Sequence, residues 1–190
     1  MQIITTKTKV YNFEELSIEA QEKVIEDNRD INTDYDWWEF TIDDSKSNLE
    51  ELGYTEPKIY FSGFWSQGDG ASFEAQVDLT KWLKAHKLAN KYRALYYHAS
   101  EYSISITKNG FYEHEYTMNI ECDYVGDYVS EISRQQYDIV ENIILEDARS
   151  EARKIYRTLE KEYEALSSDE AIKDTILANE YQFTESGKIF

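Results

Sequence analysis

The 190-residue chain is long enough for one domain with a substantial core, and its 28 aromatic residues exclude a disordered chain. Its formal net charge of −18 argues against binding nucleic acid or an anionic membrane through the bulk of the surface and leaves open a basic partner. No run of residues approaches the ~18–20 apolar residues of a membrane span, and the N-terminus lacks the apolar core of a signal peptide.

The N-terminal third predicts a strand and two helices. The β-branched residues 3–10 favour a strand. Ser17 is a suitable N-cap for a helix over 18–31. A second helix is expected over 36–52, with Gly53 as its stop. The expected apolar stripe of the first helix is Ala20, Val24, Ile25 and Ile31. In the second helix one face carries residues at spacings of three and four: Trp38, Ile42, Ser45, Leu49 and Leu52.

Two hairpins are expected next, separated by a helix. The first pairs a strand over 58–65 with an alternating strand over 71–79, and the second spans 94–122. The helix between them is expected over 80–92, with lysines on its outer face. In the second hairpin, a three-residue turn with left-handed Gly110 places all apolar residues on one face. This register pairs Ile106 with Tyr112, Ile104 with His114, and Tyr102 with Tyr116.

The last third predicts one long helix and one short helix. The long helix is expected from about 129 to 166, and Ser167 with Glu170 forms a capping box for a last helix that ends near Asn179. The expected apolar stripe of the long helix is Ile132, Ile139, Ile143, Ala148, Ala152, Ile155, Leu159, Tyr163 and Leu166.

These elements together predict an α+β fold in a single domain over residues 1–190. Two N-terminal helices precede a four- or five-stranded, mainly antiparallel sheet built from two hairpins. A long helix packs across this sheet, and a short C-terminal helix follows.

Four segments of the sequence are distinctive: YNFEELSIEAQEKVIEDNRD at 11–30, YDWW at 35–38, IYFSGFWSQGDGASFE at 59–74 and ALSSDEAIKDTILANEYQFTESGK at 165–188. They resemble a family of tailed-phage and prophage proteins, some of which carry the label "antitoxin of a toxin–antitoxin stability system". The resemblance covers nearly the whole chain and implies an accessory phage protein in the cytoplasm of an infected bacterium. It carries over no catalytic or binding residue.

The loop after the first strand is one candidate binding site. Trp65, Ser66, Gln67 and Asp69 place polar groups beside aromatic side chains, and the flanking glycines allow a ligand or a partner backbone to approach closely. The alternative is a turn whose side chains satisfy their own backbone. His114, expected on a strand beside Tyr102 and Tyr116, is a further candidate for lining a pocket.

The acidic segment is the second candidate. Residues 12–56 hold fifteen acids and three bases, whereas residues 81–108 hold six bases and one acid. Trp37 is expected to be partly exposed beside Asp36, Glu39 and Asp44, where it would anchor a protein contact. The alternative is a second core contact for Trp37.

No catalytic, cofactor or metal motif is present, and the single Cys122 excludes an intramolecular disulfide and fits a reducing compartment. We therefore expect a non-enzymatic binding protein that acts through its acidic surface on a host protein, such as a basic or nucleic-acid-binding one, as an inhibitor of host defence would. A binding protein for a nucleotide or signalling metabolite and a true antitoxin are the alternatives.

Overall fold

The computed structural model describes residues 1, 3–4, 7–125 and 129–190 and divides the chain into two compact units. Unit 1 consists of Met1–Trp37 and Lys161–Phe190, and unit 2 consists of Trp38–Glu160. A single domain over residues 1–190 is expected from the sequence, and this expectation stays a prediction.

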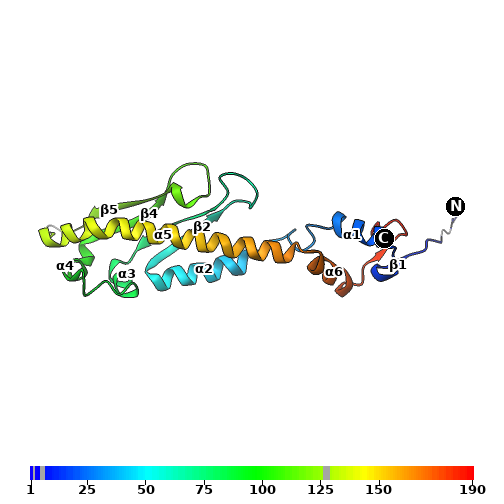
Figure 1. The fold of residues 1–190 in the computed structure, drawn as a ribbon, viewed down its shortest axis with the longest axis horizontal. Helices are drawn as coiled ribbons and strands as arrows, with labels where there is room; N and C mark the ends of the chain where they lie inside the picture. The colour runs from blue at the N-terminus through cyan, green and yellow to red at the C-terminus, as the bar shows by residue number, and fades with distance from the viewer. Residues whose placement is uncertain (2, 5–6, 126–128) are drawn as a thin grey trace. The chain divides into compact units, whose positions relative to one another are not determined.

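The α+β class is confirmed, with the elements shown in Figure 1. The α-helices are α1 (Ile18–Asp27), α2 (Glu39–Leu52), α3 (Leu79–Ala85), α4 (Arg93–Tyr97), α5 (Glu131–Leu166) and α6 (Asp169–Ala178). The 3-10 helices are η1 (Phe13–Glu15), η2 (Ala99–Glu101) and η3 (Glu115–Thr117). The strands are β1 (Tyr11–Asn12), β2 (Tyr54–Phe61), β3 (Ala71–Val77), β4 (Tyr102–Lys108), β5 (Met118–Tyr124) and β6 (Gln182–Phe183).

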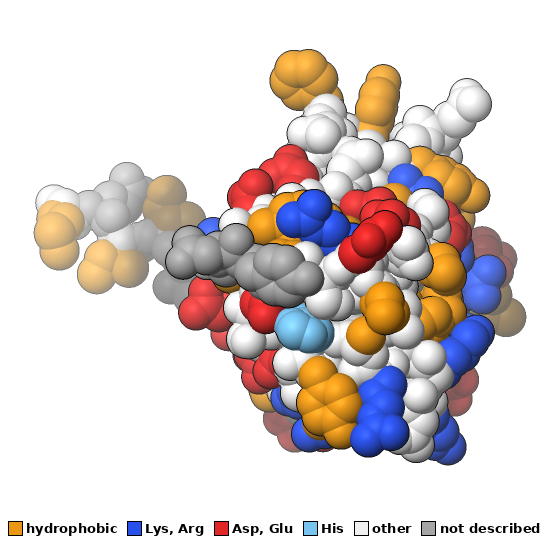
Figure 2. Space-filling view, turned by 90° about the vertical axis from the view of Figure 1, so that its left-hand side faces the viewer, with side chains coloured by type: hydrophobic (Ala, Val, Ile, Leu, Met, Phe, Trp, Pro, Cys, Tyr) orange, Lys and Arg blue, Asp and Glu red, His pale blue; other side chains and the backbone are white. Residues whose placement is uncertain are grey.

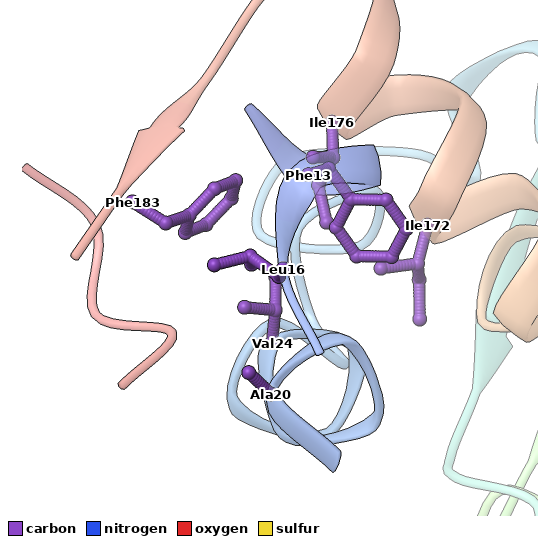
Figure 3. Packing of buried hydrophobic residues seen from close by; sticks show 7 residues of the cluster. All are labelled: Phe13, Leu16, Ala20, Val24, Ile172, Ile176 and Phe183. Carbon is purple, nitrogen blue, oxygen red and sulfur yellow. The ribbon is translucent and has the colours of Figure 1, made fainter. Parts of the chain in front are cut away.

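Unit 1 closes on a small apolar cluster that both ends of the chain supply. Strand β1 pairs antiparallel with β6, and helices α1 and α6 lie beside this ribbon. The buried members of the cluster, drawn in Figure 3, are Phe13, Leu16, Ala20, Val24, Ile172, Ile176 and Phe183. Ser17 caps α1 as expected, because its side chain accepts a hydrogen bond from the backbone of Ala20.

Unit 2 is a four-stranded antiparallel sheet with the strand order β2-β3-β4-β5. Helix α5 lies along one face of this sheet. The Tyr102 ring of β4 lies 5.0 Å from that of Tyr137, and Arg149 donates a hydrogen bond to the carbonyl oxygen of Met118 in β5. The expected inward positions of β3 are all buried, as its alternation predicts: Ala71, Phe73, Ala75, Val77 and the following Leu79.

The N-terminal boundaries differ from the expected ones. The described residues between 3 and 10 form no strand, and residues 5 and 6 lie outside the described part of the chain. The β-branched composition there is not enough, because a strand needs a partner and the pairing with β6 begins only at Tyr11. Helix α1 ends at Asp27, since the Asn28 side chain donates a hydrogen bond to the Val24 carbonyl at 2.7 Å.

Strand β2 starts and ends earlier than expected. Gly53 ends α2 with a left-handed φ of +103°, as predicted, and the strand begins at the next residue. Its register with β3 shifts between Thr55 and Lys58, where Pro57 has no N–H to offer the ladder. The residues from Phe64 to Trp65, expected in the strand, lie in the following loop.

The expected helix over 80–92 is wrong beyond Ala85. Lys87 has a left-handed φ of +59°, and the backbone N–H groups of Leu88 and Ala89 both donate to the carbonyl oxygen of Leu83. The chain turns there and restarts as α4. This path buries Leu83 of α3 and Leu95 of α4, and Leu95 lies beyond the end of the expected helix.

The expected register of the second hairpin is also wrong. Ile106 pairs with Ile120, Ile104 with Cys122, and Tyr102 with Tyr124, eight residues beyond the expected partners. A shift by an even number keeps every side chain on its face, so alternation could not distinguish the two registers. Gly110 is left-handed as expected, with a φ of +98°, but the connection is a long loop that contains η3.

Helix α5 has the expected bounds but a different buried face in its first half. Ile132 and Ile139 are 62% and 57% exposed, whereas Ser133, Tyr137, Val140 and Ile144 are buried. The buried Ser133 side chain has a hydrogen-bond partner, since its hydroxyl lies 2.8 Å from that of Tyr102. In α6 the cap is Ser168, one residue after the expected Ser167, and Asn179 ends the helix as predicted.

Candidate functional site

The acidic candidate site is split by the fold. Asp36 and Trp37 belong to unit 1, and Glu39 and Asp44 to α2 of unit 2. The expected exposure of Trp37 is wrong, because it is buried and its ring lies 5.6 Å from that of Tyr163. The exposed aromatic residue of α2 is instead Phe40, at 83%.

The loop between β2 and β3 is held by its own polar groups. One carboxylate oxygen of Asp69 accepts hydrogen bonds from the backbone N–H groups of Trp65 and Ser66, at 3.0 and 2.6 Å. The Ser62 N–H donates to the Gly70 carbonyl, and the Ser62 hydroxyl accepts from the Gly70 N–H. Asp69 therefore orders the loop, as expected for a turn whose side chains bind its own backbone groups. The same geometry presents Trp65 at 78% exposure, with Ser66 and Gln67 exposed beside it.

A row of aromatic rings ties this loop to the body of unit 2. The ring of Phe61 lies 5.7 Å from that of Trp38 and 6.4 Å from that of Phe64. Phe64 continues the row to Tyr156 of α5 at 5.5 Å. The Tyr156 hydroxyl donates to the carbonyl oxygen of Gly63, so the base of the loop is fixed to α5 by a hydrogen bond as well as by ring contacts.

The loop between β4 and β5 contains His114, which the sequence analysis wrongly places on a strand. His114 accepts a hydrogen bond from the backbone N–H of Tyr116, and the two rings stack with centroids 5.1 Å apart. The guanidinium group of Arg149 lies over the Tyr116 ring, 5.7 Å from its centroid. Glu115 forms an ion pair with Arg153, and a second oxygen of its carboxylate lies 3.1 Å from Nδ1 of His114. Tyr102 is a sheet residue that pairs with Tyr124 and takes no part in the loop.

The two loops pack against each other, and two glycines make this possible. A side chain at Gly70 would stand 2.7 Å from the carbonyl oxygen of Glu113, and one at Gly68 would meet the Tyr112 ring at 3.1 Å. Gly68 also has a left-handed φ of +105°. The Ser72 hydroxyl donates to Glu113, which in turn pairs with Lys108 at 2.8 Å.

We call the exposed side chains of residues 65–69 and 111–116 the two-loop surface. Its four aromatic members are Trp65, Phe111, Tyr112 and Tyr116, with exposed fractions of 78, 101, 66 and 68%. The loops lie next to each other along the upper side of unit 2 in Figure 1, and Figure 2 shows hydrophobic side chains standing out at this upper edge. Five of the nine candidate residues lie in these loops: Trp65, Ser66, Gln67, Asp69 and His114.

A partly buried polar cluster lies elsewhere in unit 2. One oxygen of Asp147 accepts hydrogen bonds from the Tyr54 hydroxyl at 2.8 Å and from the Trp82 indole at 3.1 Å, and it lies 3.1 Å from Nε2 of His86. Nδ1 of His86 lies 2.9 Å from the Trp82 carbonyl, so this nitrogen donates. Burial, followed by the charge of Asp147, raises the pKa of Tyr54. Both ring nitrogens of His86 are engaged, which leaves neither for a substrate.

Cys122 is not arranged as a nucleophile. Burial is the main cause that raises the pKa of its thiol, and the charges of Glu141 and Asp123 act in the same direction. A raised pKa keeps the thiol protonated at neutral pH, and the thiolate is the reactive form.

Among the described residues, no group of three or more His, Cys, Asp and Glu side chains is placed to hold a metal ion. No helix in the described ranges combines the length and the apolar character that a membrane crossing needs.

A family model places this geometry in context. The model of a domain of unknown function, DUF8835, matches residues 37–169. The chain belongs to the DUF8835 family. The matched range includes all of unit 2 and therefore the whole two-loop surface. No curated protein and no solved structure matches the chain.

Sequence reasoning missed the second half of the two-loop surface. Phe111 and Tyr112 directly follow Asn109-Gly110 and were assigned to a strand, where alternation would bury every second residue. The Asn-Gly pair indicates a turn but not its length. The signal that could have revealed the loop is the second alternating run from Met118 to Tyr124, which competes for the same partner strand.

Proposed function

We propose that this DUF8835 member is a non-enzymatic binding protein that contacts another protein through its two-loop surface. The observation that carries the proposal is the gathering of four exposed aromatic rings on two loops that are fixed by their own hydrogen bonds. Aromatic residues dominate the energetics of protein interfaces, and anchors that are already ordered lose little conformational entropy on binding.

Three features support a rigid presentation of these rings. Asp69 orders the first loop, the Gly70–Glu113 approach locks the loops together, and stacking on His114 orients Tyr116. The titratable groups of the surface are engaged in the same contacts, which disfavours acid–base catalysis there.

The partner that fits this surface is a protein with an apolar socket and a basic rim. The net charge of −18 steers the chain toward positive partners and away from polyanions. The resemblance to tailed-phage and prophage proteins supports a host protein of the infected bacterium as this partner, and inhibition of a host defence system is the role that we propose.

The test removes the two most exposed rings and asks whether capture of the partner is lost. The double variant Trp65→Ala/Phe111→Ala and wild type are used as bait in infected host lysate, with quantitative mass spectrometry of captured proteins. We expect one stoichiometric basic protein, held on the order of 30-fold more weakly by the variant, since loss of an interface anchor costs about 2 kcal/mol or more.

The matched control is Phe190→Ala, which removes a 71% exposed aromatic ring from unit 1. The control should capture the partner as wild type does, and circular dichroism should show that all three proteins are folded. Equal capture by wild type and the double variant would refute the two-loop surface as the contact site.

A further inference from the structure

A basic surface follows α2 in unit 2, although the chain as a whole is strongly acidic. The 22 residues from Leu79 to Ser100 contain no Asp or Glu, whereas the whole chain has 38 acids in 190 residues. The five cations of this segment are all exposed: Lys81, Lys84, Lys87, Lys91 and Arg93. They lie on α3, on the turn after it and on the first residue of α4.

These cations are not neutralised by carboxylates. Within the described part of the chain, none of the five forms a salt bridge, although Arg29, Lys46, Lys108, Arg149, Arg153 and Lys154 all do. Three of them instead lie over tyrosine rings. Lys84 stands 5.5 Å from the centroid of Tyr96, and Arg93 stands 5.5 Å from that of Tyr97. Tyr97 is 66% exposed, so an apolar ring accompanies the charges. Figure 2 looks onto the end of unit 2 where α4 lies and shows Lys and Arg side chains beside hydrophobic ones along its lower edge.

Helix α2 has the complementary arrangement. Phe40, Asp44, Ser47 and Glu51 are spaced by four, three and four residues, so they share one helix face, and all four are exposed. This face therefore combines carboxylates with an exposed aromatic ring, as the basic surface combines cations with Tyr97.

The two faces belong to adjacent elements. Gly53, which ends α2, accepts a hydrogen bond from the backbone N–H of Asp78, and Asp78 caps α3. Helices α2 and α3 are in contact, as are α3 and α4. In Figure 1 the three helices follow one another along the lower side of unit 2.

We infer that this surface binds a second copy of the chain, in a two-fold dimer that lays the acidic face of α2 on the basic α3–α4 surface of the partner. A two-fold axis between the patches satisfies both contacts at once, because each copy presents the same two patches. Phe40 of each copy would then face the cations of the other, a favourable ring–cation contact.

The like net charges of the two copies oppose this dimer, but they act at longer range than the facing patches. The Debye length at physiological ionic strength is about 8 Å, so charges in direct contact outweigh distant repulsion there. The attraction between the facing patches and the repulsion between the net charges can be separated by experiment. The substitution Asp44→Lys, for example, weakens the attraction between the patches and also lowers the net negative charge that opposes the dimer.

The experiment is a charge swap in the full-length chain, measured by sedimentation velocity over a concentration series at physiological salt. The acid variant is Asp44→Lys/Glu51→Lys, the base variant is Lys84→Glu/Lys91→Glu, and a four-site variant combines them. The acid variant changes the net charge from −18 to −14, the base variant changes it to −22, and the four-site variant restores −18. The control Asp174→Lys/Glu185→Lys also gives −14, from exposed positions of unit 1.

We expect a wild-type dimer whose Kd rises at least about tenfold in both the acid and the base variant, because like charges then face each other. The four-site variant should recover dimerisation, and the control should match wild type. A wild type that stays monomeric at every concentration would overturn the inference. So would association that follows net charge alone, with the acid variant and the control both dimerising more tightly than wild type.

Discussion

Unit 1 closes on an apolar cluster assembled from the two ends of the chain, whereas unit 2 places the partly buried carboxylate of Asp147 among a phenol, an indole and an imidazole. The halves of unit 1 are separated by the 123 residues of unit 2, while unit 2 is continuous. Closing so long a loop costs conformational entropy, which is smaller once the intervening chain has folded. The two units are therefore stabilised differently, and unit 2 is expected to form before unit 1.

The largest expected effect is loss of unit 1 alone, through Phe183→Ala. Phe183 is fully buried, pairs with Tyr11 across the ribbon and stands 6.4 Å from the Phe13 ring. Removing such a ring costs about 3–5 kcal/mol, a large share of the stability of a small apolar cluster. Hydrogen exchange with mass spectrometry should show α1 and α6 unprotected and β2 to β5 as protected as in wild type.

The control for this change is Phe190→Ala, an exposed ring in the same unit that should alter neither set of peptides. Simultaneous loss of protection in both units of Phe183→Ala would contradict separate stabilisation of the two units, since it would mean that they fold as one.

The next effect concerns the polar cluster of unit 2. Asp147→Ala removes the carboxylate oxygen that accepts from the Tyr54 hydroxyl and the Trp82 indole and lies beside Nε2 of His86, at a cost of about 3 kcal/mol in the free energy of unfolding. Asp147→Asn keeps an acceptor oxygen and removes only the charge, so its cost should be smaller, about 1 kcal/mol. Urea unfolding followed by tryptophan fluorescence measures both.

Asp138→Ala, at an exposed position of the same helix, is the matched control and should stay near wild type. If the Ala and Asn variants of Asp147 both unfold as this control does, the carboxylate contributes nothing to the stability of unit 2. Unit 2 would then be stabilised by apolar contacts, as unit 1 is.

The smallest effect sharpens the description of unit 1 at a single helix cap. Ser168 accepts a hydrogen bond from the backbone of Ala171, so Ser168→Ala should cost about 1 kcal/mol. Ser167 only donates to the Tyr163 carbonyl one turn earlier, and Ser167→Ala should be nearly neutral. The midpoint of thermal unfolding of unit 1, followed by exchange at α6, distinguishes the two. If Ser167→Ala destabilised unit 1 more than Ser168→Ala, Ser167 would be the N-cap, as the sequence predicts.

The sequence predicted most elements of unit 2 but not how they meet. Gly53 as a helix stop, the inward face of β3 and the bounds of α5 follow from local preferences that the fold leaves unchanged. The register of β4 with β5 does not, because two alternating segments compete for one strand and the pattern is the same for both. The path after Ala85 depends on burying Leu83 and Leu95, which helical periodicity alone cannot show.

The candidate site shows the same division. Its first loop was recognised from Trp65 and the glycines around Asp69, since aromatic, polar and glycine residues in a short run favour an exposed loop. The second loop cannot be recognised in this way. The sequence favours one helix that contains both Trp37 and Trp38, whereas Trp37 lies before α2, in unit 1, and is buried there.

The α+β class, the charge distribution, the Ser17 cap of α1 and the Gly53 stop of α2 could all be predicted from the sequence, because they depend on residues close together in the chain. The tertiary structure decided which aromatic residues stay exposed, which face of α5 is buried and which loops share a surface. The physical reason is that each of these depends on contacts between residues far apart in sequence, such as Gly70 with Glu113 and Tyr102 with Tyr137, whose pairing no local pattern specifies.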